Sequence, residues 1–217
     1  MVCDNCNPLM GYPGKVVWCG KDGECTTCGD QVMPIQDTNS KKRWDSYFHS
    51  ICEVVASKSP CFSRKIGAIL VRDNSIVSTG YNGPARGITH CGHDRFMRDG
   101  GLQSKMEDML KNGGLRRGDI NKTCPRKLIG YESGHGMEWC IAEHAESNCV
   151  ANAARLGVST NNTTLYMNCV IPCGRCLGTL INAGVAEIVV DLLTNFDAVG
   201  MYLSSHDKVR IREFTHV

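Results

Sequence analysis

Residues 144–176 read HAESNCVANAARLGVSTNNTTLYMNCVIPCGRC, and this stretch decides the fold. Residues 144–156 are rich in helix-forming side chains and end at Gly157, a residue type that commonly follows a helix. Residues 163–169 predict a strand, and residues 173–183 predict a second helix. A helix, a strand and a helix in direct succession predict a layered α/β domain.

The two ends of this stretch carry side chains that bind metals. His144 lies two residues before Glu146, and Cys173 and Cys176 form a Cys-x-x-Cys pair. Each motif alone is weak, because such a pair also occurs in structural zinc sites and redox pairs. Together, one nitrogen and two sulfur ligands leave the fourth position of a tetrahedral Zn²⁺ open for water, which is typical of catalytic zinc.

Both motifs fall in the first turns of predicted helices, where the positive end of the helix dipole favours thiolates. We therefore expect His144, Cys173 and Cys176 to bind a catalytic zinc. Glu146 lies only two residues after His144, and we expect it to stay off the metal. We expect it to be the catalytic residue that takes a proton from water and delivers it to the substrate.

The rest of the chain adds further α/β elements. A helix is predicted from residue 42 to the residues before Pro60, and residues 66–71 and 75–79 predict a hairpin around Asp73-Asn74. Residues 186–191, 196–205 and 209–214 predict a strand, a helix and a strand. The apolar residues of the first helix recur at spacings of three and four: Trp44, Tyr47, Phe48, Ile51, Val54 and Val55.

Residues 92–123 are expected to form an insertion. They carry six glycines, and seven basic against five acidic residues, which is too glycine-rich for regular structure throughout. Ser104 with Glu107 predicts a capping box at the start of a short helix over residues 104–112. A surface insertion is the favoured interpretation, with a lid or a subunit contact as alternatives.

Composition limits the class of protein. The 217 residues are 42% hydrophobic and 21% charged, as in a globular protein with a real core. The net charge of +2 disfavours a polynucleotide partner and favours a small ligand. No apolar run approaches the roughly 18 residues of a membrane helix, and the first residues do not resemble a signal peptide. We therefore expect no membrane association and a cytoplasmic protein whose fourteen cysteines are reduced.

The combination of H-x-E with P-C-x-x-C is the signature of zinc-dependent nucleobase deaminases. From about residue 44 to residue 191 the chain resembles the cytidine and deoxycytidylate deaminase superfamily. Within it, dCMP deaminases share C-x-SRKIGA at residues 61–68, GYNG at residues 80–83, and HAE-x-N at residues 144–148 followed by AAR-x-G at residues 153–157. The resemblance implies a cytidine-deaminase-like three-layer α/β fold with a central five-stranded mixed sheet over residues 41–217.

The same resemblance implies an activity. It is the hydrolytic deamination of dCMP to dUMP and ammonia, in which zinc-activated water attacks C4 of cytosine and Glu146 protonates N3 and then the leaving ammonia. This reaction would supply dUMP for thymidylate synthesis. The family is usually oligomeric, so a homo-oligomer is expected. The residues expected to contact the substrate, or a regulatory dCTP or dTTP, are Arg64, Lys65, Asn82, Ala145 and Arg155.

A second zinc is predicted at the N-terminus, in residues 1–32. Cys3-x-x-Cys6 and Cys25-x-x-Cys28 have the spacing of a zinc ribbon, which would be an appendage that dCMP deaminases generally lack. Residues 1–30 carry two lysines against four acidic residues. This acidic balance favours a protein contact or a role in assembly over nucleic-acid binding.

The resemblance also implies a structural zinc within the deaminase domain, as in phage and bacterial relatives. Its ligands would be Cys61, Cys91, Cys124 and Cys140, with His90 in place of Cys91 or His135 as an alternate. Scattered buried thiols are the other interpretation. Cys52, Cys149 and Cys169 are expected to be core residues.

Three functions remain in view at this stage. Deamination of dCMP is the leading interpretation. Deamination of another cytosine or purine nucleoside or nucleotide, or of a polynucleotide, would use the same metal centre. A non-catalytic zinc-dependent scaffold or binding protein is the third, and Glu146 speaks against it because a binding module has no use for that carboxylate.

Overall fold

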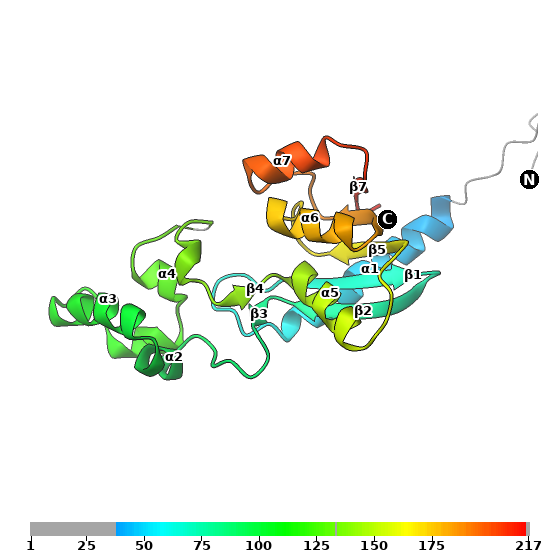
Figure 1. The fold of residues 1–217 in the computed structure, drawn as a ribbon. Coiled ribbons are helices and arrows are strands. Elements are labelled where there is room, and N and C mark those ends of the chain that lie inside the picture. The colour runs from blue at the N-terminus through cyan, green and yellow to red at the C-terminus, as the bar shows by residue number, and fades with distance from the viewer. Residues whose placement is uncertain (1–37, 133, 216–217) are drawn as a thin grey trace, which may run out of the picture. The chain divides into compact units, whose positions relative to one another are not determined.

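The computed structural model describes residues 38–132 and 134–215. The chain divides into two compact units, residues 1–41 and residues 42–217, and the second is described below (Figure 1). The predicted N-terminal zinc ligands, Cys3, Cys6, Cys25 and Cys28, lie outside the described residues.

A five-stranded sheet forms the centre of the second unit. Its strands are β1 (Gly67–Arg72), β2 (Ser75–Tyr81), β5 (Thr163–Met167), β6 (Val185–Val190) and β7 (Arg210–Glu213). They lie in the order β2-β1-β5-β6-β7. β1 is antiparallel to β2 and to β5, whereas β5, β6 and β7 are parallel. The predicted mixed five-stranded sheet is confirmed.

The predicted hairpin joins β1 to β2. Asp73 and Asn74 have φ angles of 50° and 57°, which is the left-handed conformation that a tight two-residue hairpin requires at both positions. Asp and Asn tolerate this conformation better than other residues with a Cβ atom. The turn therefore fixes the pairs next to it, Arg72 with Ser75 and Val71 with Ile76, and an irregularity between Leu70 and Val71 shifts the register beyond them.

Helices cover both faces of the sheet. On one face lies α1 (Thr38–Ser57), whose Phe48 packs with Ile69 and Val189. On the other face lie α5 (Ala145–Arg155) and α6 (Gly174–Asn182), with α7 (Ala198–Ser204) packed against α6. This is the expected three-layer arrangement (Figure 1). Cys52 and Cys149 are fully buried, as expected for core residues, and Cys169 is partly buried against the core.

The buried face of α1 agrees only in part with the predicted one. Phe48 is buried and Ile51 and Val55 pack partly buried against the core, whereas Trp44, Tyr47 and Val54 are exposed. The helix also buries Asp45, Cys52 and Ala56, which the predicted face did not include. The reason is close packing of the helix backbone on β1. A Cβ atom on Gly67 would lie 2.6 Å from the backbone nitrogen of Ala56. Only small side chains fit between a helix and a strand at this separation, and Cys52 and Ala56 occupy the contact.

Residues 83–143 connect β2 to α5. They form β3 (Gly83–Pro84), α2 (His93–Arg98), α3 (Gly100–Lys111), the 3₁₀ helix η3 (Arg117–Asn121), α4 (Pro125–Leu128), the 3₁₀ helix η4 (Met137–Trp139) and β4 (Ala142–Glu143). β3 and β4 pair antiparallel, which brings together the two ends of this connection, residues 83–84 and 142–143. In the part of the chain that the structure describes, no helix is long and apolar enough to cross a membrane.

The insertion has a small core of its own, which the glycine content did not predict. Its buried apolar residues are Phe96, Leu102, Met106, Leu115 and Ile120. The predicted capping box at Ser104 is wrong, because α3 begins four residues earlier. Asp99 is the N-cap residue, and its carboxylate accepts a hydrogen bond from the Leu102 backbone N–H at 3.0 Å.

Candidate active site

Four potential metal-binding side chains meet where two helices begin. The ligand atoms of His144, Glu146, Cys173 and Cys176 all lie within 4.8 Å of one another. His144 is the N-cap residue of α5, and Cys173 is the N-cap residue of α6. Neither side chain caps its own helix, so both are free to face the shared site. The structure thus brings together all four residues that the sequence motifs singled out.

The distances fit a tetrahedral zinc ion. His144 Nδ1 lies 3.5 Å from Cys173 Sγ and 3.4 Å from Cys176 Sγ. Zinc–sulfur bonds of about 2.3 Å and zinc–nitrogen bonds of about 2.0 Å at tetrahedral angles place the two ligand atoms about 3.5 Å apart. One imidazole and two thiols at this spacing are therefore a suitable donor set for Zn²⁺.

The electrostatics of the cluster favour negative charge on sulfur. The pKa of Cys173 is lowered to about 4, because Cys176 and then His144 hydrogen-bond to its sulfur. The pKa of His144 is raised to about 10 by its contacts with Cys173 and Glu146. Conversely, the pKa of Cys176 is raised, chiefly by its neighbour Cys173. Two thiolates in contact repel each other, so a cation between them would let both lose their protons.

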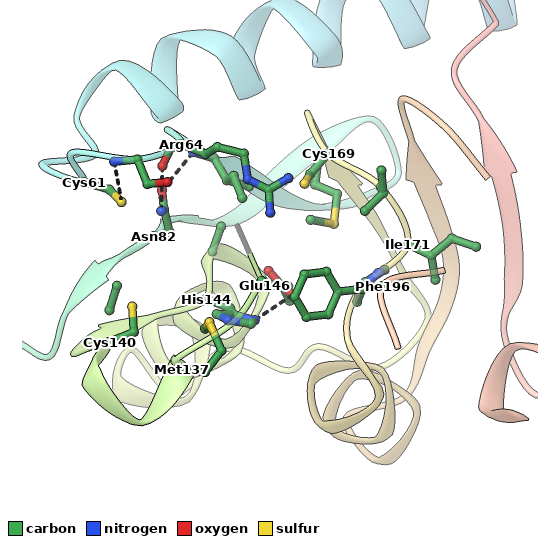
Figure 2. A pocket seen from close by; sticks show the side chains of 18 of the residues that line it. Cys61, Arg64, Asn82, Met137, Cys140, His144, Glu146, Cys169, Ile171 and Phe196 are labelled. Atoms are coloured by element: carbon green, nitrogen blue, oxygen red, sulfur yellow. Dashed lines mark hydrogen bonds and ion pairs between the residues drawn. The ribbon is translucent and has the colours of Figure 1, made fainter. Parts of the chain in front are cut away.

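Glu146 lies beside the cluster in the first turn of α5. Its side chain is buried, and its Oε1 lies 3.6 Å from His144 Nδ1. Glu146 also lines a cavity that extends away from the cluster and includes Arg64, Asn82, Cys169 and Phe196. Figure 2 shows Glu146 and His144 on one side of this cavity and Arg64 reaching over it from the segment before β1. A buried carboxylate that lines a cavity can exchange protons with a bound molecule.

Comparison with known proteins identifies the family. The model of the cytidine and deoxycytidylate deaminase zinc-binding region matches residues 42–192. The chain belongs to this family. The matched region contains the four clustered residues and the whole insertion.

Two relatives place the chain among its neighbours in the family. It is 30% identical over 171 residues to the deoxycytidylate deaminase of Schizosaccharomyces pombe, covering 79% of this chain and 44% of that protein. It is 32% identical over 144 residues to the deoxycytidylate deaminase of Enterobacteria phage T4, covering 64% of this chain and 72% of that protein. The chain spans less than half the length of the two yeast relatives that it matches.

A solved structure supports the fold. The dCMP deaminase of cyanophage S-TIM5 in its apo form aligns over 79% of this chain and 97% of its own, with a TM-score of 0.51 and 18% identity. At this level of identity the similarity shows the architecture alone. It agrees with the three-layer deaminase fold that the motifs predicted.

The residues expected to contact a nucleotide separate into two groups. Arg64, Asn82 and Ala145 line the cavity beside Glu146. Arg155 lines a different surface cavity, together with Arg86. Lys65 is exposed and lines neither of them.

Asn82 holds the segment before β1 in place. Its Oδ1 accepts hydrogen bonds from the Ile66 backbone N–H at 2.8 Å and the Ser59 hydroxyl at 2.7 Å. Its Nδ2 donates to the Arg64 carbonyl oxygen at 2.9 Å. Both lone pairs of the amide oxygen are therefore used within the protein. Asn82 positions Arg64 over the cavity.

Sequence reasoning missed two residues at this site. Arg126, from α4, lines the cavity. Asp197 is the N-cap residue of α7, and its carboxylate accepts hydrogen bonds from the backbone N–H groups of Gly200 and Gly174. It thereby fixes the turn that carries Cys173 and Cys176. No spacing in the sequence relates either residue to the metal ligands, although aspartate before a helix is a common capping signal.

The four cysteines predicted to bind a structural zinc line one small cavity together with His90; they are Cys61, Cys91, Cys124 and Cys140. His135 does not line it. Burial raises the pKa of the Cys91 thiol, although Arg95, whose Nη1 lies 3.6 Å from its sulfur, opposes this effect.

Proposed function

We propose that the protein is a zinc-dependent deaminase that converts dCMP and water to dUMP and ammonia. The observation that carries the proposal is a buried carboxylate, Glu146, beside a histidine and two cysteines whose spacing fits zinc. Relatives named deoxycytidylate deaminase support dCMP as the substrate, and a cavity beside the cluster, lined by Arg64 and Arg126, offers a place for it. The reaction would thereby supply dUMP for thymidylate synthesis.

The site residues divide the chemistry among them. Zn²⁺ held by His144, Cys173 and Cys176 would act as a Lewis acid and supply hydroxide near neutral pH. Glu146 takes the proton that the water loses and delivers it to N3 as oxygen adds to C4 of the cytosine. A second proton, moved by Glu146 to the amino group, lets ammonia leave and forms the uracil carbonyl. Burial of Glu146 keeps bulk water from competing for these protons.

Substrate specificity is the first test of this proposal. Purified zinc-loaded protein would be offered dCMP, dCTP, cytidine, a 5-substituted dCMP and single-stranded DNA, while ammonia release is followed. We expect the highest kcat/KM with dCMP. Turnover of cytidine or DNA without turnover of dCMP would contradict the assignment, and absence of turnover of any compound would favour a scaffold role.

The cysteine cavity is proposed to hold a structural zinc. Cys91 directly precedes and Cys124 directly follows the insertion, while Cys61 precedes β1 and Cys140 precedes β4, so an ion bound by them would tie the two ends of the insertion together. Such a tie would offset the entropy lost in ordering a long connection. The N-terminal cysteines are proposed to hold a further zinc.

The surface cavity at Arg155 is proposed to bind a regulatory nucleotide. Arg86 and Arg155 line it, and their charge suits the phosphates of dCTP or dTTP. Addition of either nucleotide should change the rate of dCMP deamination, and Arg155→Gln should remove that response. We further propose a homo-oligomer, which sedimentation velocity would test.

A further inference from the structure

Arg126 is a buried cation without an ion-pair partner. The residue is only 8% exposed to solvent, and its Nε is buried without a hydrogen-bond partner. Its Nη1 donates to the carbonyl oxygen of His135 at 2.6 Å. No carboxylate in residues 38–132 or 134–215 forms a salt bridge with it. A guanidinium withdrawn from water in this way is costly unless an anion accompanies it.

Two other arginines with little exposure have the acidic partners that Arg126 lacks in the described part of the chain. Arg95 pairs with Asp99 at 3.1 Å and also donates to the Trp139 carbonyl oxygen at 2.8 Å. Arg212 pairs with Asp45 at 2.6 Å and with Glu187 at 2.9 Å. The fold thus gives these cations acidic partners. Arg126 has only a carbonyl group, although it is as buried as Arg95.

The position of Arg126 shows where its anion would come from. Arg126 lines the cavity that holds Arg64 and Glu146, and it also lines the neighbouring cysteine cavity. The first cavity is the one that would receive a substrate, and the zinc content of an Arg126 variant tests the second. A molecule whose reacting group lies at Glu146 would therefore place another part of itself near two guanidinium groups. Guanidinium groups match the geometry of phosphate oxygens, with which they form paired charge-assisted hydrogen bonds.

We infer that Arg126 recognises the 5′-phosphate of the substrate and makes the enzyme selective for a nucleoside monophosphate over the free nucleoside. This inference rests on the proposed function. It assigns a specificity-determining residue to the segment that follows the insertion. Arg64, positioned by Asn82, would be the second cation at the same phosphate.

Ligand binding tests this inference separately from catalysis. Calorimetry would compare dUMP with deoxyuridine on zinc-loaded wild-type protein, Arg126→Gln and Arg126→Lys. We expect the wild-type protein to bind dUMP at least about tenfold more tightly, as for the loss of one charged hydrogen bond or more. In Arg126→Gln this preference should fall to about one. Arg126→Lys should restore part of this preference, because lysine keeps the positive charge but lacks the planar set of N–H donors that can bind two phosphate oxygens at once.

Zinc content and a surface variant serve as controls. Arg98→Gln, an exposed change on α2, should leave the preference for dUMP unchanged. A preference retained in Arg126→Gln, or a loss of zinc from that variant, would overturn the assignment, because the latter would mean that Arg126 supports the neighbouring cysteine cavity. Wild-type turnover of dCMP is measured alongside. Its absence would overturn the proposed function, while the binding ratio would still decide the role of Arg126.

Discussion

His144 and Cys173 both stand at helix N-caps without capping their helices. A capping side chain at such a position contributes about 0.5–2 kcal/mol to stability. The two residues forgo this contribution and instead direct a nitrogen and a sulfur to a common point, 3.5 Å apart. This use of two helix starts is what a metal ligand requires and a purely structural residue does not.

Glu146→Gln separates metal binding from proton transfer. Glutamine has the same shape but cannot carry a proton between water and substrate. We expect the variant to keep its zinc and its fold while kcat for dCMP falls by about 10²–10⁴-fold. Glu138→Gln, a change of the same type at an exposed position, should keep full activity. Substantial residual activity in Glu146→Gln would remove the proton-transfer role.

The residues at the site differ in how far the sequence could predict them. His144, Glu146, Cys173 and Cys176 have fixed spacings and chemically specific side chains, so pattern alone predicted that they would cluster. Arg126 and Asp197 lie in segments without such a pattern. Arg126 is distinguished by burial without a carboxylate, and Asp197 by a hydrogen bond to Gly174, 23 residues earlier. Both properties exist only in the folded chain.

At the scale of elements, periodicity predicted the main helices and strands, and packing decided which faces they bury. The helix before Pro60 was predicted, but its buried face only in part: Phe48 is buried as predicted, whereas close contact with Gly67 adds the small residues Cys52 and Ala56. The insertion was expected to be regular only in part, with one short helix over residues 104–112. Its glycines lie mostly at helix ends and in left-handed turns, such as Gly113 with φ 69°, and so punctuate a small helical core.

Gly80 is required by the contact between α5 and β2. A Cβ atom there would lie 2.5 Å from the backbone nitrogen of Cys149 and would also overlap the Ala145 carbonyl oxygen. Backbone atoms cannot move aside cheaply, so Gly80→Ala should cost about 2–3 kcal/mol of unfolding free energy in denaturant titrations. It should also lower activity, since α5 carries Glu146. Gly118→Ala, which meets open space, should change stability by less than about 0.5 kcal/mol.

Asp45 joins α1 to β7 and makes stability depend on pH. Burial alone would raise its pKa, but hydrogen bonds from Arg212 and from the Thr215 backbone N–H prevail and lower it. A lowered pKa means that Asp45 stabilises the fold above its unfolded pKa of about 3.9 and that this contribution is lost as pH falls through the folded-state pKa.

Asp45→Asn should therefore lower the free energy of unfolding at pH 7 by about 3 kcal/mol, because it leaves Arg212 half-paired. The difference from the wild-type protein should shrink as pH falls below about 4. Urea titrations across this range would measure it, with the exposed Asp207→Asn as the matched control. A difference that does not change with pH would contradict the role of the Asp45 charge.

At the scale of the whole molecule, the proposed cysteine sites predict how many zinc ions each chain binds. Plasma mass spectrometry of the full chain should find between two and three zinc ions per chain: one at His144, with others at the N-terminal cysteines and the cysteine cavity. Cys25→Ser with Cys28→Ser should lower the count by one without abolishing dCMP turnover. A count of one in the wild-type chain would contradict the N-terminal zinc.

The most direct test of the whole account is the amount of dUMP formed from dCMP by the full chain as its zinc content is varied. We predict one dUMP and one ammonia for each dCMP consumed, loss of this turnover on chelation, and recovery when one equivalent of Zn²⁺ returns to the His144 site. Unchanged dCMP in the presence of fully loaded protein, or turnover that persists after complete zinc removal, would contradict it.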